Sequence, residues 1–143
     1  MSTTIRHTFL LLMLGCCFLF ACSNSPSPVA VSGHVAIDGQ PLPSGKVVLE
    51  PITDGQRRDA DVANGNFALP ESEGVYPGQE FKVTIKAFRK TGRKYPNANM
   101  GASYEEVEQY LPEQYNSAST LQVTISPRAA QNHFEFDLAS QAP

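Results

Sequence analysis

Residues 31–51 read VSGHVAIDGQPLPSGKVVLEP, and this stretch decides the fold that the chain is expected to adopt. Its first seven residues alternate with period two, the pattern of a strand with one buried face. The inward positions are Val31, Gly33, Val35 and Ile37. Asp38-Gly39 predicts a tight turn, because glycine accepts positive φ and aspartate can hydrogen-bond its own backbone. Residues 46–50 form the returning strand, and Pro51 ends it.

Five further segments repeat this alternation of apolar and polar residues. They are residues 57–62, 66–69, 79–88, 121–125 and 134–138. Asn64-Gly65 is the strongest hairpin signal, because a type I′ turn needs positive φ at both central positions. Seven short strands within residues 30–139 predict an all-β fold, a seven-stranded antiparallel Greek-key β-sandwich.

One long polar excursion separates two of the expected strands. Residues 89–102 are predicted to form a loop. Ser103 and Glu106 then have the spacing of a helix capping box, and Pro112 marks the end of the segment. We therefore expect one short helix, from Ser103 to Pro112, within the excursion 89–116.

Composition restricts the kinds of partner and site. The 143 residues include 11 basic and 14 acidic ones, a balance that argues against a nucleic-acid partner. All three cysteines, Cys16, Cys17 and Cys22, precede the expected sandwich. The sandwich therefore has no disulfide, no cysteine nucleophile and no thiolate metal site.

The N-terminal segment has the features of a signal peptide. Arg6 and His7 precede an uncharged, mostly apolar run over residues 9–20. As a helix this run would span only ~18 Å, too short for a hydrocarbon core of ~30 Å. It is therefore interpreted as the apolar region of a cleaved signal rather than as a membrane span.

Leu19-Phe20-Ala21-Cys22, followed by the polar residues 23–28, resembles the lipobox of bacterial lipoproteins. The resemblance implies cleavage between Ala21 and Cys22, a diacylglyceryl group on Cys22, and an acylated new amino terminus. Ser23 after the cysteine favours the outer over the inner membrane by the same resemblance. Cys16 ends a second candidate lipobox, and an ordinary signal with an incidental cysteine remains an alternative. Cys22 is preferred because a longer apolar run precedes it and a polar tether follows it.

These signals divide the chain into a signal peptide (1–21), a lipidated tether (22–29), a β-sandwich (30–139) and a C-terminal tail (140–143). The sandwich resembles the carboxypeptidase regulatory-like, or transthyretin-like, family. The motifs that carry the resemblance are Gly33-x-Val35, Asp38-Gly39-Gln40-Pro41-Leu42, Lys46-Val47-Val48-Leu49, Asn64-Gly65-Asn66-Phe67, Pro77-Gly78 followed by residues 81–85, residues 111–116 and residues 134–138. They are turns and strand faces, so the resemblance implies a fold and carries no catalytic residue across.

No motif for catalysis, a cofactor or a metal stands out. Asp59 and Asp61, near Asn64 and Asn66, miss the spacing of an EF-type calcium loop. His34, His133 and Glu135 would make a zinc site only if their strands pair in register, and isolated surface histidines are the simpler interpretation. We therefore expect a non-enzymatic protein without a cofactor. A small transthyretin-like hydrolase is the remaining enzymatic alternative.

A basic stretch is the candidate binding site. The proposed patch comprises Lys86, Arg89, Lys90, Arg93, Lys94, Tyr95 and Tyr104. Three interpretations stay open: a docking surface for an anionic headgroup, envelope glycan or acidic protein, a solvated strand face, or a set of charges paired with the glutamates that follow. The expected function is a lipid-anchored binding module of the cell envelope that faces the periplasm or the cell surface, or alternatively a structural, self-associating envelope protein.

Overall fold

The computed structural model describes residues 26–96 and 103–140. The expected signal peptide, Cys16, Ala21, Cys22 and most of the C-terminal tail lie outside the described residues. Within the described ranges, no helix has the length and apolar character needed to cross a membrane.

The described chain is mostly strand. Its strands are β1 (Val31–Ile37), β2 (Gln40–Pro41), β3 (Ser44–Pro51), β4 (Arg58–Ala63), β5 (Asn66–Leu69), β6 (Glu80–Lys86), β7 (Phe88–Pro96), β8 (Ser103–Gln109), β9 (Gln122–Thr124) and β10 (His133–Leu138). The helical pieces in the described residues are the single 3₁₀ turns η1 (Glu71–Glu73), η2 (Glu113–Tyr115) and η3 (Ala129–Gln131).

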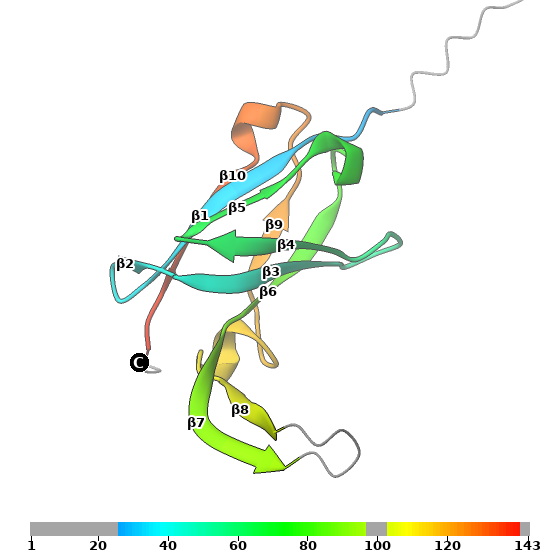
Figure 1. The fold of residues 1–143 in the computed structure, drawn as a ribbon. Coiled ribbons are helices and arrows are strands. Elements are labelled where there is room, and N and C mark those ends of the chain that lie inside the picture. The colour runs from blue at the N-terminus through cyan, green and yellow to red at the C-terminus, as the bar shows by residue number, and fades with distance from the viewer. Residues whose placement is uncertain (1–25, 97–102, 141–143) are drawn as a thin grey trace, which may run out of the picture.

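The main sheet follows the order β10-β1-β5-β4-β3-β6-β9, with β2 paired to β1. Strands β4 and β5 share only the pairing Ala63–Asn66, so the sheet curls at their hairpin and its two halves enclose one core (Figure 1). Residues from both halves form a single buried cluster, in which Val35, Phe81, Val83 and Ile85 have no exposed surface. The predicted all-β sandwich is confirmed.

The seven predicted strands are all present, and their turns have the expected geometry. Asp38 and Gly39 have φ values of 49° and 76°, and Asn64 and Gly65 have 50° and 82°. Both dipeptides therefore adopt the positive φ values that a type I′ turn requires. The pairing differs from the antiparallel prediction at one place: β1 and β10 run parallel, from Ser32–His133 to Ile37–Leu138. The whole chain between them supplies the long crossover connection that a parallel pair needs.

The expected loop is wrong over residues 89–96, and the expected helix from Ser103 to Pro112 is wrong; residues 97–102 lie outside the described residues. Strands β7 and β8 form a separate two-stranded sheet that projects away from the sandwich (Figure 1). Oppositely charged and aromatic side chains face one another across the two strands, and such cross-strand pairs stabilise an antiparallel ladder. The capping-box pattern at Ser103 and Glu106 is thus overridden by contacts with a partner strand that precedes it in the chain.

Candidate functional site

The proposed binding patch lies along the β7–β8 hairpin and at its root. Lys86 ends β6, whereas Tyr104 lies on β8. The remaining members are on β7: Arg89, Lys90, Arg93, Lys94 and Tyr95. Gly92, with φ of 80°, lies where the pairing between Lys90 and Lys94 is irregular, so β7 carries a bulge there.

Three of the basic side chains in the patch are paired with glutamates across the hairpin. Arg89 Nε lies 2.7 Å from Glu108 Oε1. Lys90 Nζ lies 2.9 Å from Glu105 Oε2, and Arg93 Nε lies 2.9 Å from Glu106 Oε2. The interpretation that these charges pair internally is confirmed for these three residues, although their glutamates lie on a strand rather than on the expected helix. The hairpin therefore presents far less net positive charge than its sequence of basic residues suggests.

Glu106 accepts the densest set of hydrogen bonds on the hairpin. Thr91 Oγ1 donates to Glu106 Oε2 at 2.7 Å, and Tyr95 Oη donates to Glu106 Oε1 at 3.3 Å. The Thr91 hydrogen bond lowers the pKa of Glu106 below its ordinary value of 4.5, with the nearby Arg93 guanidinium acting in the same direction. The negative charge of Glu106 in turn raises the pKa of Tyr95. Both shifts favour the state in which Glu106 is charged and Tyr95 carries its proton.

The hairpin is expected to lose order in acid. Because folding lowers the pKa of Glu106, its stabilising contribution is present above pH 4.5 and is lost as the pH falls through the lower folded-state pKa. The ring-proton NMR shifts of Tyr95 and Tyr104, which stack on each other, should therefore change in a transition below pH 4.5. Glu106→Gln should remove this transition, whereas Glu73→Gln in η1 should leave it in place. The same transition in Glu106→Gln would contradict the assignment.

The hairpin also exposes apolar and aromatic surface. The Tyr95 and Tyr104 rings stack with centroids 5.5 Å apart, and Tyr104 remains 58% exposed. Val107 is 57% exposed and lies on the face of β8 opposite to that of Tyr104. Aromatic residues are enriched and lysine and glutamate depleted at protein interfaces, so these side chains are better contact candidates than the paired charges.

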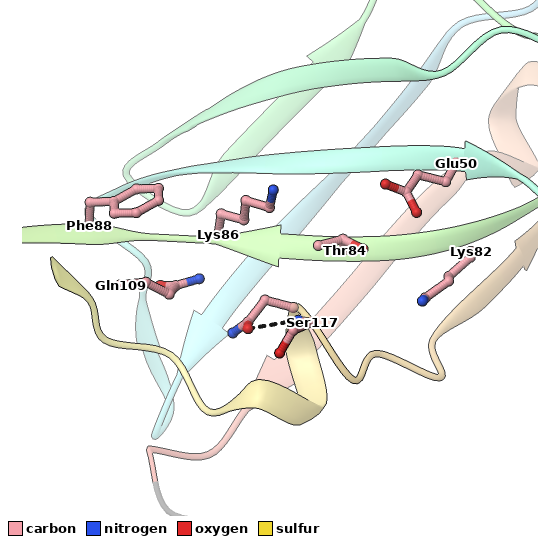
Figure 2. A pocket seen from close by; sticks show the side chains of 8 residues that line it. Glu50, Lys82, Thr84, Lys86, Phe88, Gln109 and Ser117 are labelled. Carbon is pink, nitrogen blue, oxygen red and sulfur yellow. Dashed lines mark hydrogen bonds between the residues drawn. The ribbon is translucent and has the colours of Figure 1, made fainter.

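A pocket lies at the hairpin root, between the outer face of β6 and the η2 turn. Its volume is about 310 Å³, at the lower end of the range for small-molecule sites. Figure 2 shows Phe88 and Gln109 at one end and Glu50 and Lys82 at the other. We call this the root pocket; its lining residues are Glu50, Lys82, Thr84, Lys86, Phe88, Gln109, Asn116 and Ser117.

The walls of the root pocket are held by specific hydrogen bonds. Asn116 Nδ2 donates to the carbonyls of Leu111 and Pro112 at 3.1 and 2.9 Å, which fixes the η2 turn. Gln109 Oε1 accepts from the backbone N–H groups of Ala87 and Leu111 at 3.1 and 3.2 Å. These bonds tie the base of the hairpin to the sandwich and fix the orientation of the Gln109 amide.

That orientation leaves a buried donor without a partner. Gln109 Nε2 is shielded from solvent and donates no hydrogen bond within the described residues. Flipping the amide would not help, since the amide nitrogen would then face the two backbone N–H groups that its oxygen now accepts. A buried unsatisfied polar group costs about 1–3 kcal/mol, and such groups in native proteins call for a functional or structural explanation.

The root pocket has a small positive excess. Lys82 and Glu50 are directly opposite each other on β6 and β3, and Lys86 is opposite Lys46. Lys46 is held outside the pocket lining by Asp59 and Asp61, at 2.6 and 3.1 Å from its Nζ. The hydrogen bond to Asp59 raises the pKa of Lys46. The lining therefore has two ammonium groups against one carboxylate.

Strands β1 and β10 do pair, with His34 opposite Glu135, but the residues considered for a metal are not arranged as a metal site. His133 Nε2 lies 2.8 Å from Glu135 Oε1, while His34 Nδ1 lies 3.4 Å from the side-chain oxygen of Asn66. The carboxylates of Asp59 and Asp61, which were considered as metal ligands, both form ion pairs with the ammonium group of Lys46. In the part of the chain that the structure describes, no cluster of three or more His, Cys, Asp or Glu side chains is arranged to hold a metal ion.

The sequence pattern indicated only part of the root pocket. Period-two alternation over residues 79–88 puts Lys82, Thr84 and Lys86 on the face of the strand opposite Phe81, Val83 and Ile85. All three line the root pocket, although Thr84 is buried there. Glu50 joins them through the β3–β6 register, a pairing that the separate strand patterns do not specify. Gln109 was assigned to the expected helix, and its place opposite Phe88 depends on the β7–β8 pairing. No local signal indicated Asn116 or Ser117.

Comparisons with known proteins give no family assignment. No protein-family model, curated protein or solved structure matches this chain.

Proposed function

We propose that this chain is a lipid-anchored, non-enzymatic binding module of the cell envelope, with the β7–β8 hairpin as its binding arm and a second envelope protein as its partner. The lipobox-like sequence at Cys22 supports the anchor, and Ser23 favours the outer membrane. The resemblance to carboxypeptidase regulatory-like domains agrees with a sandwich that acts as a scaffold.

The observation that carries the binding role is the hairpin itself. In the described residues, β7 and β8 pair only with each other, so each has a free edge. A two-stranded hairpin alone is marginally stable in water, and a third strand or a packed face usually supports it. Exposed Tyr104 and Val107 on its two faces and its free edges offer what a protein partner needs for contact.

Self-association is the second candidate, and the same free edges favour it. Two hairpins could pair edge to edge into one four-stranded sheet, the kind of association that exposed strand edges permit. The ion pairs across each hairpin would remain intact in that arrangement.

Binding rather than catalysis is what the root pocket supports. Thr84 and Ser117 supply hydroxyl groups, but within the described residues neither is hydrogen-bonded to Glu50 or to a lysine that could act as a base. An activated nucleophile needs such a partner within hydrogen-bonding reach.

A site-specific crosslink tests the arm. A photo-crosslinking amino acid at Val107 of the full-length chain, irradiated in intact membranes, should give one discrete adduct. The same amino acid at Ile52, an exposed position in the β3–β4 loop, should give none. An adduct of twice the chain mass would identify self-association, and a different mass a separate partner. Equal or absent adducts at both positions would rule out the hairpin as the binding arm.

A further inference from the structure

The root pocket has features of a ligand site that the binding arm does not use. The Gln109 side chain lines the pocket, and its amide nitrogen has no acceptor within the described residues. Because this nitrogen is closed to water, a ligand oxygen reaches it only when the side chains around it move aside. The Gln109 amide is fixed by Ala87 and Leu111, so the donor keeps its direction. A ligand that satisfies it must present an acceptor oxygen near the root of the hairpin.

The charged residues of the pocket lining restrict the chemical class of the ligand further. Lys82 and Lys86 favour an anion, and charge-assisted hydrogen bonds to a carboxylate or phosphate are the strong ones. Glu50 can only accept hydrogen bonds when ionised, so it needs a ligand that also donates. A simple anion would satisfy the lysines and leave Glu50 facing a like charge. A molecule with both hydroxyl groups and an acidic group satisfies all three side chains.

An exposed ring completes the site. Phe88 lies at the end of the pocket near Gln109 (Figure 2). Its side chain is 55% exposed. A sugar ring has an apolar C–H face that can cover such an aromatic surface and remove it from water. The pocket volume of about 310 Å³ suits a ligand of one or two rings rather than a long chain.

We propose that the root pocket binds a sugar acid, a pyranose ring that carries a carboxylate. The carboxylate lies between Lys82 and Lys86, ring hydroxyls donate to Glu50, an oxygen accepts from Gln109 Nε2, and the apolar face of the ring covers Phe88. Neither Tyr104 nor Val107 lines the site, so the ligand can be tested separately from the protein partner proposed for the arm. The same chemistry occurs in a free monosaccharide and in a unit of an acidic glycan.

Saturation-transfer NMR on the full-length chain in a polyoxyethylene detergent, which has no sugar headgroup, tests this site. The probes are D-galacturonate, D-galactose, tri-galacturonate and inorganic phosphate. Galacturonate should bind about tenfold more tightly than galactose, because only the acid makes charge-assisted bonds to the lysines. It should also shift the side-chain amide signal of Gln109. Tighter binding of tri-galacturonate would identify a glycan as the source, and equal binding a free sugar.

Two lysine variants separate a specific site from general attraction to positive charge. Lys86→Met keeps the aliphatic stem and should reduce galacturonate affinity about tenfold, to the level of galactose. Lys94→Met on β7, outside the pocket lining, should leave the affinity unchanged. The proposal would be overturned by equal losses of galacturonate affinity in the two variants, or by phosphate binding as tightly as galacturonate. It would also be overturned if no saturation were transferred from the protein to any of the sugars.

The outcomes also distinguish this proposal from the one above. A chain that binds no galacturonate but still gives the Val107 adduct would overturn the pocket ligand and leave the binding arm intact. The reverse result would overturn the arm alone.

Discussion

Phe81→Ala is expected to destabilise the sandwich by about 3–5 kcal/mol, because it removes a fully buried aromatic ring and leaves a cavity. Phe81 lies on β6, where it is paired with Pro51 of β3 on one side and Val123 of β9 on the other. Domains of this size have a total stability of about 5–15 kcal/mol, so the loss is a large part of the whole.

Phe88→Ala is the matched control. Phe88 follows β6 in the same chain segment, but it lies on the outer face and is 55% exposed. Truncating it should change the free energy of unfolding by no more than about 0.5 kcal/mol. The midpoint of urea unfolding, followed by tyrosine fluorescence in a chain that begins at Ser23, measures both effects; this chain keeps every core residue. Equal shifts in the two variants would contradict the assigned inward and outward faces.

The sandwich was predictable because its signals are local. Period-two alternation marks the buried face of β6, where Phe81, Val83 and Ile85 are all fully buried. Asn64-Gly65 specifies its own turn, since the backbone angles depend on those two residues alone. The parallel pairing of β1 with β10 was not predictable in this way, because it joins segments at opposite ends of the sandwich and no local pattern encodes strand direction.

The hairpin was missed because its signals are not local. Ser103 and Glu106 satisfy a helix rule by themselves. Their strand conformation depends on Thr91, Arg93 and Tyr95, which reach Glu106 from a strand that begins more than ten residues earlier. The root pocket is hard to predict from the sequence for the same reason. Gln109 enters it only when β8 is a strand, and Glu50 enters it only through the β3–β6 register.

Cys22→Ala is expected to abolish lipid attachment. Incorporation of labelled palmitate into the full-length chain should fall to background, and the chain should keep the mass of the unprocessed precursor. Cys16→Ala, the matched control, should retain both the label and the mature mass. Label lost only in Cys16→Ala would move the lipobox to that cysteine. Label retained in both variants would exclude each of them as the lipidation site.

The cysteine that carries the proposed lipid would also set how far the sandwich can stand from the membrane. Chain pairing in the sandwich begins at Val29, whose backbone N–H donates to Val75 at 2.8 Å. Seven residues from Cys22 to Val29 can span at most about 25 Å, whereas thirteen residues from Cys16 could span about 47 Å. Attachment at Cys22 would therefore hold the N-terminal end of the sandwich within about 25 Å of the membrane, whereas the β7–β8 hairpin lies at the opposite end of the sandwich (Figure 1). Two or three acyl chains give stable anchoring, while one alone is marginal, so the fully processed form should stay in the membrane fraction and Cys22→Ala should lose that lipid-dependent retention.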